Sequence, residues 1–159
     1  PGAKSFASDA EKDAAVTKAL NDIINRSPRS DEAAVAQYLL GARAADEGRL
    51  DEASRLLESA AKSGNREYAS LAKLALAEVY GVRGKRAEAE KLLRELINQP
   101  TVLVSKGAAT LALARLMAPS QPQEALKLLA PLRDAPGELG RAAITAYGDI
   151  ALRNKPLGS

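Results

Sequence analysis

A helix–turn–helix design recurs at a fixed spacing in this chain, and it constrains the fold more than any other feature. Its first copy runs from Leu40 to Ala61, LGARAADEGRLDEASRLLESAA. An apolar helical pattern surrounds Gly41, Gly48 marks a break, and a second helix opens at Leu50. Two further copies follow, LALAEVYGVRGKRAEAEKLLRELI and LALARLMAPSQPQEALKLLAPL.

The spacing of the copies predicts the architecture. Ala53, Ala89 and Ala125 occupy the same place in the three copies, 36 residues apart. A fixed period in this range, built of paired amphipathic helices, is typical of a stacked helical array. We therefore predict an all-α fold, a right-handed α-solenoid of antiparallel helix pairs with about three full repeats and a half repeat at each end.

Composition limits the chemistry that the chain can perform. Hydrophobic residues make up 46% of the sequence but aromatic residues only 3%, so the helices must pack closely on small side chains. The chain has no cysteine and no histidine, which removes disulfides, thiol and imidazole catalysis and the usual zinc ligands. Serine and tyrosine lie without a general base beside them. We expect no enzymatic activity, no cofactor and no metal site.

Charge and hydropathy argue against two classes of partner. Residues 1–80 carry 11 basic and 13 acidic side chains, and residues 81–159 carry 12 and 7, without a dense basic run. Nucleic-acid binding normally needs clustered basic residues with stacking aromatics, so we expect no nucleic-acid partner. No apolar run approaches the roughly 20 residues that span a bilayer. Direct membrane insertion by this fragment is therefore not expected.

The order of the chain predicts one domain with two short flanks. Residues 1–7 are a flexible lead-in, 8–153 form a single helical repeat domain, and 154–159 form a tail. Ser8 and Glu11 fit a capping box for a first helix that continues to about Asn25. This helix is similar to the second helix of a repeat whose first helix is not in the sequence.

Later boundaries follow from serine, threonine, proline and glycine. Ser30 is expected to cap the second helix, and Thr101 the helix that ends at Met117. A short helix is expected from Ala125 to Leu132. Leu139 to about Arg153 then opens a fourth unit that the sequence does not complete.

These repeats resemble the tetratricopeptide repeat family. The family's small residue in the first helix matches Gly41, Ala77, Ala114 and Gly148, and its small residue in the second helix matches Ala53, Ala89 and Ala125. The bulky position four residues later matches Leu57, Leu93 and Leu129. The sequence departs from the family where Gln37 and Lys73 replace an early tryptophan and where only Tyr80 keeps the tyrosine of the first helix.

A second resemblance concerns the cellular setting. The segment PTVLVSKGAATLALARLM and the closing YGDIAL are similar to the soluble domain of the bacterial ancillary Sec-translocon subunit family. This resemblance implies an N-terminal membrane anchor outside this sequence and a periplasmic or other extracytoplasmic location. It also implies a role in secretion or envelope protein biogenesis. A cytoplasmic location is the alternative.

Two sets of residues follow from the repeat. The first should pack the helices at close crossings: Gly41, Ala53, Leu57, Ala77, Ala89, Leu93, Ala114, Ala125, Leu129 and Gly148. The second should line the concave groove of the array: Tyr38, Ala42, Leu74, Glu78, Leu111 and Arg115. An apolar groove with light charge at its edge suits an amphipathic partner helix. The protein's own first helix could instead cover part of it.

Two functions from different classes stay open. The first is a protein–protein interaction scaffold that binds a partner helix or peptide in the concave groove. The second is a structural self-assembly module that forms a homo-oligomer through the C-terminal end of the array. A third interpretation, a cation site at Asp46, Glu47, Asp51 and Glu52, is disfavoured, because acidic residues around a helix start are typical of a solvated cap.

Overall fold

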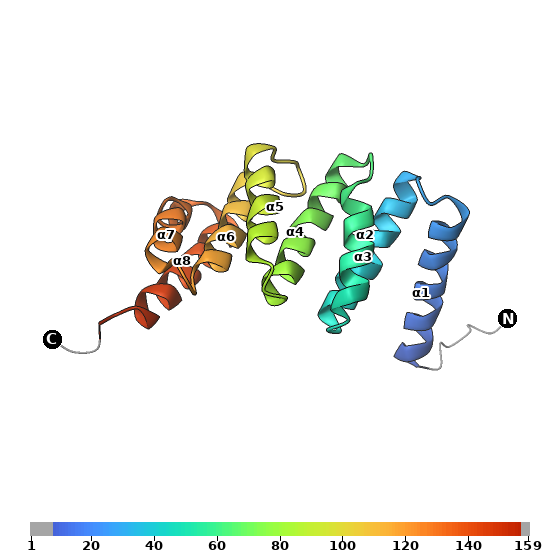
Figure 1. Ribbon diagram of the computed structural model, residues 1–159, viewed down its shortest axis with the longest axis horizontal. Helices are drawn as coiled ribbons and strands as arrows, with labels where there is room; N and C mark the ends of the chain where they lie inside the picture. Colours follow the sequence, from blue (N-terminus) through green and yellow to red (C-terminus); the bar gives the residue numbers. More distant parts are fainter. Residues whose placement is uncertain (1–7, 157–159) are drawn as a thin grey trace. The chain divides into compact units, whose positions relative to one another are not determined.

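The computed structural model describes residues 8–156, and within that range the chain is helical and contains no strand. The prediction of an all-α fold is confirmed for this part of the chain. The lead-in at 1–7 and the tail residues 157–159 lie outside the described residues. The helices are α1 (Asp9–Arg26), α2 (Asp31–Asp46), α3 (Leu50–Ala61), α4 (Arg66–Val82), α5 (Arg86–Asn98), α6 (Lys106–Met117), α7 (Pro122–Leu129), the 3-10 helix η1 (Ala130–Asp134) and α8 (Gly137–Arg153) (Figure 1).

The chain divides into two compact units, residues 1–72 and 73–159, and α4 contributes residues to both. Serine side chains begin the first two helices of the first unit. Ser8 Oγ accepts a hydrogen bond from the backbone N–H of Glu11 (3.2 Å), and Ser30 Oγ accepts one from Ala33 (3.0 Å). Each cap satisfies a backbone donor that a helix start otherwise leaves without a partner. Both predicted caps are confirmed.

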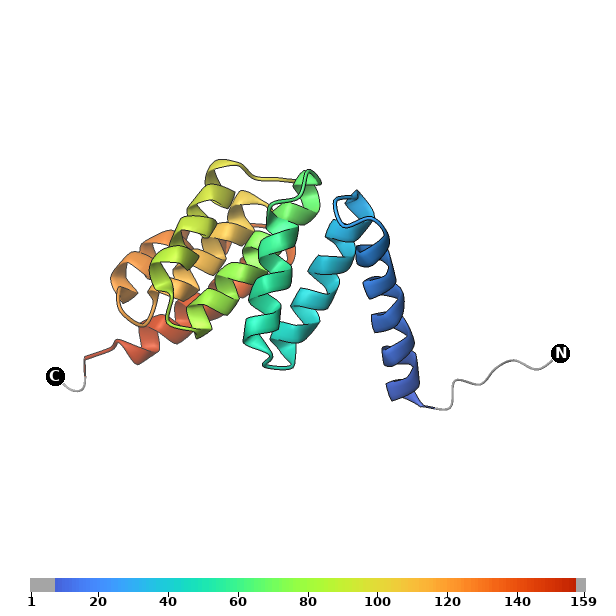
Figure 2. The same ribbon diagram turned by 45° about the vertical axis from the view of Figure 1, so that its right-hand side comes forward.

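The helices α2 and α3 form an antiparallel pair in the first unit (Figure 2). Gly41 lies at their crossing, and a Cβ added there would meet Leu57 Cγ at 2.8 Å. Leu57 and Ala53 are fully buried. The missing side chain of Gly41 therefore provides the space that Leu57 fills.

Two of the helix–helix turns use the same backbone geometry. Gly48 and Gly84 both have φ of +76°, a conformation that is costly for residues with a Cβ. In each turn the next residue closes the helix end with a hydrogen bond, from Arg49 N to Ala44 O and from Lys85 N to Tyr80 O, both 2.8 Å. The two turns lie 36 residues apart in the sequence.

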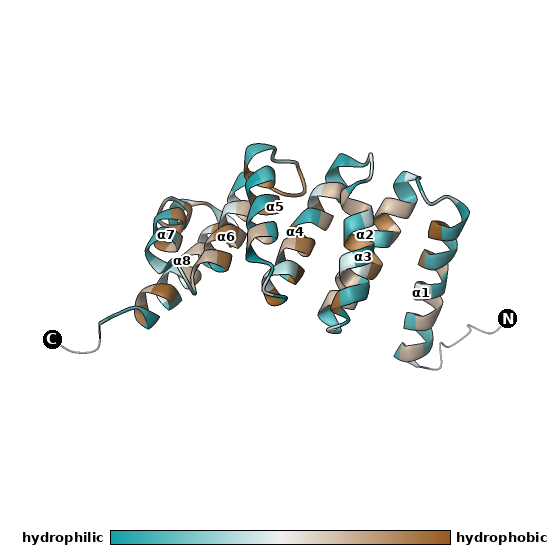
Figure 3. Ribbon diagram, viewed as in Figure 1, coloured by the Kyte–Doolittle hydropathy of each residue, from teal (hydrophilic) through white to brown (hydrophobic). Residues whose placement is uncertain are grey.

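The core of the second unit is aliphatic. Leu93, Leu113 and Leu129 are buried together with alanines of α4 to α8. Figure 3 shows polar and apolar residues alternating along α5, as expected for a helix with one buried face. Among the residues predicted to pack the helices, all are buried except Gly148, which is half-buried.

The segment before α6 differs from the sequence prediction. Thr101 does not cap α6, because Ser105 does: its Oγ accepts from Ala108 N at 3.1 Å. Thr101 instead closes a turn, in which its Oγ1 accepts from Val104 N (3.0 Å) and its own N–H donates to Val104 O (2.9 Å). The turn directs Val104 into the core, where it is fully buried. Burial of Val104 stabilises the fold more than a start of α6 at Thr101 would.

The short helix expected from Ala125 to Leu132 also has different bounds. The α-helix begins at Pro122 and ends at Leu129, and the chain then continues as η1. Pro131 has no N–H to donate to a carbonyl four residues earlier, which favours the change to a tighter 3-10 turn.

Gly140 and Gly148 lie two turns apart in α8 but have opposite surroundings. A Cβ at Gly140 would lie 1.9 Å from the carbonyl oxygen of Ala135, whereas one at Gly148 would meet nothing within 4 Å. We predict that Gly140→Ala lowers the free energy of unfolding by about 3 kcal/mol. Gly148→Ala should raise it by about 0.5–1 kcal/mol, because alanine favours a helix interior. Urea denaturation followed by circular dichroism measures both, and equal effects would contradict this packing.

Ala89 tests the crossing of α5 with its neighbours. This alanine is fully buried, whereas Ala87 on the same helix is exposed. We predict that Ala89→Leu destabilises the protein by about 1–3 kcal/mol through overpacking. The control Ala87→Leu should change the free energy of unfolding by less than about 0.5 kcal/mol. An unchanged melting midpoint for Ala89→Leu would exclude the close crossing.

Candidate functional site

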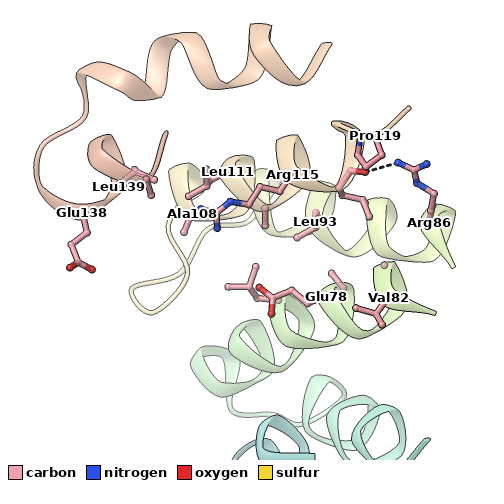
Figure 4. A pocket seen from close by; sticks show the side chains of 16 residues that line it. Glu78, Val82, Arg86, Leu93, Ala108, Leu111, Arg115, Pro119, Glu138 and Leu139 are labelled. Atoms are coloured by element: carbon pink, nitrogen blue, oxygen red, sulfur yellow. Dashed lines mark hydrogen bonds between the residues drawn. The ribbon is translucent and has the colours of Figure 1, made fainter. Parts of the chain in front are cut away.

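A cavity of about 820 Å³ opens in the second unit, lined by residues of α4, α5, α6, the following turn and α8 (Figure 4). The helix α6 contributes one complete face to its wall. The positions recur at steps of three and four, which places them on one side of the helix. They are Ala108, Leu111, Ala112, Arg115 and Leu116.

The helix α4 supplies a second wall with the same periodicity: Leu74, Ala77, Glu78, Gly81 and Val82. The remaining boundary comes from Arg86 and Leu93 of α5, from Pro119, and from Glu138, Leu139 and Ala142 at the start of α8. The wall is therefore mainly leucine and alanine, with charged groups among them.

Glycines allow two leucines to reach the cavity wall. A Cβ at Gly81 would lie 3.2 Å from Leu116 Cδ1, and one at Gly107 would lie 2.4 Å from Leu139 Cδ2. Leu116 therefore leans over α4, and Leu139 leans over the start of α6. In both contacts the leucine packs against a glycine, which has no side chain to occupy the space.

Four of the residues predicted to line a groove lie around this cavity. Leu111 is buried, Leu74 is half-buried, and Glu78 and Arg115 are exposed. The other two, Tyr38 and Ala42, belong to the first unit, where both are half-buried.

Tyr38 has its own packing partner in the first unit. Its ring meets Tyr68 edge-on, with centroids 5.8 Å apart and an interplanar angle of 67°. This geometry is a favourable aromatic arrangement.

The charged groups of the cavity differ in what they contact. Arg86 donates a hydrogen bond to the carbonyl oxygen of Leu116 (2.6 Å) and so joins the start of α5 to the end of α6. Glu138 Oε1 lies 3.8 Å from Arg141 Nη2, within ion-pair distance. Arg115 makes no hydrogen bond or ion pair with other residues in the described range. Figure 4 shows Glu78 and Arg115 on opposite sides of the cavity.

Sequence reasoning did not place several wall residues in the site. Ala108, Ala112 and Leu116 share the face of α6 that carries Leu111 and Arg115, so extension of the helical period in both directions would have found them. Leu139 and Ala142 come from α8, and their proximity depends on the path of the chain through α7 and η1. No local pattern encodes that path.

The acidic run around Gly48 is engaged by arginine. Arg43 Nε lies 3.0 Å from Glu47 Oε1, and Arg49 bonds to both Glu47 and Glu52. The hydrogen bond from Arg49, followed by that from Arg43, lowers the pKa of the Glu47 carboxyl. The bonds to Glu47 and then Glu52 raise the pKa of Arg49.

Residues 8–156 also bear on metal binding and membrane insertion. In this range no three acidic side chains come together in a way that could hold a metal ion. No helix there combines the length and apolar character needed to cross a bilayer.

Comparison with known proteins gives no relative: no protein-family model, curated protein or solved structure matches the chain. The residues and geometry of the cavity therefore carry the functional argument.

Arg86 provides a test of how the cavity edge is held. We predict that Arg86→Ala lowers the free energy of unfolding by about 1–2 kcal/mol, because the carbonyl of Leu116 loses a charged donor. Arg94→Ala is the matched control on the same helix, since Arg94 only pairs with Glu90 on the surface. Arg94→Ala should lower the free energy of unfolding by less than about 0.5 kcal/mol. Equal losses in chemical denaturation would show that the bond to Leu116 does not hold the cavity edge.

Proposed function

We propose that the second unit is a protein-binding module and that its cavity receives one amphipathic helix of a partner protein. The observation that supports this proposal is the cavity itself, about 820 Å³ with a wall of leucine and alanine from four helices and charged groups beside it. An amphipathic helix buries its apolar side chains in a groove of this kind and keeps its polar face in water.

The charges specify the chemistry of the occupant further. Arg115 is exposed beside Leu111 and Ala112 and makes no ion pair with the described residues. A partner that presents aliphatic residues at three- and four-residue spacing, with a carboxylate at the edge, would fill the cavity and pair with this arginine. Charge complementarity at an edge contributes mainly to orientation and selectivity.

The wider architecture in this proposal is a tetratricopeptide-like α-solenoid with about three full repeats. Three observations support it: the buried alanines at 36-residue spacing, the matching glycine turns at Gly48 and Gly84, and helix bounds close to those the period predicts. In such an array the first helices of successive repeats line the binding surface. The cavity residues Leu74 and Leu111 occupy equivalent places in that scheme.

The resemblance to ancillary Sec-translocon subunits supplies the setting of the proposal. The partner helix would then belong to a protein of the bacterial envelope or its secretion machinery, and the chain would act on the extracytoplasmic side of the membrane through an anchor outside this sequence. Site-specific crosslinking in the native host tests both the site and this setting.

Leu74 and Val82 provide the decisive variants. A photo-crosslinking amino acid in place of Val82, a cavity residue that is 75% exposed, should capture an amphipathic helical segment identifiable by mass spectrometry. Adding Leu74→Lys places a charge in the apolar wall, one turn from Glu78. We predict that it weakens binding by about 2 kcal/mol, roughly thirtyfold, and leaves helicity unchanged.

Val102→Lys is the matched control, because Val102 is 90% exposed and does not line the cavity. It should leave capture unchanged. Equal capture by Leu74→Lys and the unsubstituted protein would refute the cavity as the binding site. Loss of helicity in Leu74→Lys would assign Leu74 to the core instead.

A further inference from the structure

A second hollow adjoins the cavity, near the end of α6. It measures about 230 Å³ and lies between Ala118, the residue that follows α6, and the second half of α8. Arg115 and Pro119 line both the hollow and the cavity, so the two spaces lie on either side of these residues. We call the cavity and the hollow together the extended groove.

One face of α8 runs along the extended groove. Leu139 and Ala142 line the cavity. Ala146, Asp149 and Arg153 line the hollow. These positions recur at steps of three and four residues, which places them on one side of the helix. From Leu139 to Arg153 this face is about 21 Å long, given the helical rise per residue. It therefore matches the length of an occupying helix of about four turns.

The hollow differs from the cavity in the charge of its rim. Its floor is apolar, because Ala146 and Ile150 are buried. Its rim carries Arg115, Asp149 and Arg153, which are all exposed. The rim thus holds two positive groups and one negative group, and one positive charge is left without a counter-charge among the residues that line the hollow.

No described residue pairs with the three charged side chains of the rim. Neither arginine makes a side-chain hydrogen bond or ion pair within residues 8–156, and Asp149 makes none there either. Two other exposed arginines of the second unit, Arg94 and Arg141, have acidic partners at 2.7 and 3.8 Å. An excess of unpaired guanidinium groups beside an apolar floor is complementary to a carboxylate from another molecule.

We propose that the hollow is an anion subsite of the extended groove, in which Arg115 and Arg153 bind carboxylate side chains of the partner helix. This inference rests on the proposed function, in which aliphatic side chains of the same helix fill the cavity. A guanidinium presents several N–H donors in one plane and binds a carboxylate through two of them. The partner is therefore an acidic amphipathic helix, whose aspartate or glutamate residues continue the line of its aliphatic residues.

Asp149 gives the subsite a property that allows a test by sign. Its carboxylate has the same charge as the proposed ligand and lies one turn before Arg153 on α8. It therefore opposes the binding of a carboxylate, whereas the arginines favour it. Removal of the negative charge should strengthen binding and removal of a positive charge should weaken it, although both residues line the same hollow.

Three synthetic peptides provide the probe. Each has about 18 residues, enough for a helix that spans the extended groove, and blocked ends that carry no charge. All share a stripe of leucine and alanine at three- and four-residue spacing. They differ only at two positions that continue the stripe, which are both Glu, both Gln or both Lys. Fluorescence anisotropy at low ionic strength should show that the Glu peptide binds about fivefold more tightly than the Gln peptide, and the Lys peptide more weakly than either.

Variants of the rim assign this preference to the hollow. Arg115→Gln should reduce the ratio of the Gln-peptide Kd to the Glu-peptide Kd to below about twofold, and Asp149→Asn should raise this ratio about threefold. The control Arg94→Gln removes an exposed arginine that does not line the extended groove, and it should leave the ratio unchanged. Circular dichroism checks that all variants keep the helicity of the unsubstituted protein.

The outcomes separate this inference from the proposed function. Equal affinity for the Glu and Gln peptides overturns the anion subsite, and so does a ratio that neither rim variant changes. Tighter binding of the Lys peptide overturns it as well and indicates a basic partner. In each of these cases the proposed function stands if Leu74→Lys still weakens binding of the neutral Gln peptide. Binding that Leu74→Lys does not weaken contradicts the proposed function, and no binding of any peptide at millimolar concentration contradicts both.

Discussion

Close approach between helices at glycine and alanine is the constraint on which this structure depends. With aromatic residues at 3% of the sequence, few large rings are available to fill the space between helices. Dispersion contacts fall off steeply with distance, so a core of leucine and alanine is cohesive only where backbones come near each other. Gly107 against Leu139 of α8 and Gly41 against Leu57 of α3 are the closest examples between helices.

The cavity of the second unit results from the same close packing on small residues. Three helices approach through small residues at their crossings, and alanines such as Ala77, Ala108 and Ala142 are too short to fill the space between the walls. Two leucines of the wall pack against glycines at its edge: Leu116 lies against Gly81, and Leu139 lies over Gly107. Tight crossings and an open space between them therefore have one origin.

Features encoded over short stretches were predictable from the sequence. The serine caps of α1 and α2 and the helix end at Gly48 each depend on residues within one or two turns, and the structure has them where the pattern placed them. The start of α6 was not predictable in this way. A capping threonine was available at Thr101, but burial of Val104 is a tertiary effect that no local rule contains. The α8 side of the cavity was missed for the same reason.

In the proposed binding module, the composition of the cavity wall would determine how the cavity distinguishes one occupant from another. A wall of leucine and alanine offers dispersion contacts but few directed hydrogen bonds, so it separates ligands by volume. One methylene more or less changes affinity by about 1–3 kcal/mol in an apolar pocket, far less than an unmatched hydrogen-bonding group does. Partner helices with different aliphatic side chains of similar size would then bind such a wall with nearly equal affinity. Recognition of the proposed kind would be degenerate, and the sequence of an occupant would be free to drift as long as its shape is kept.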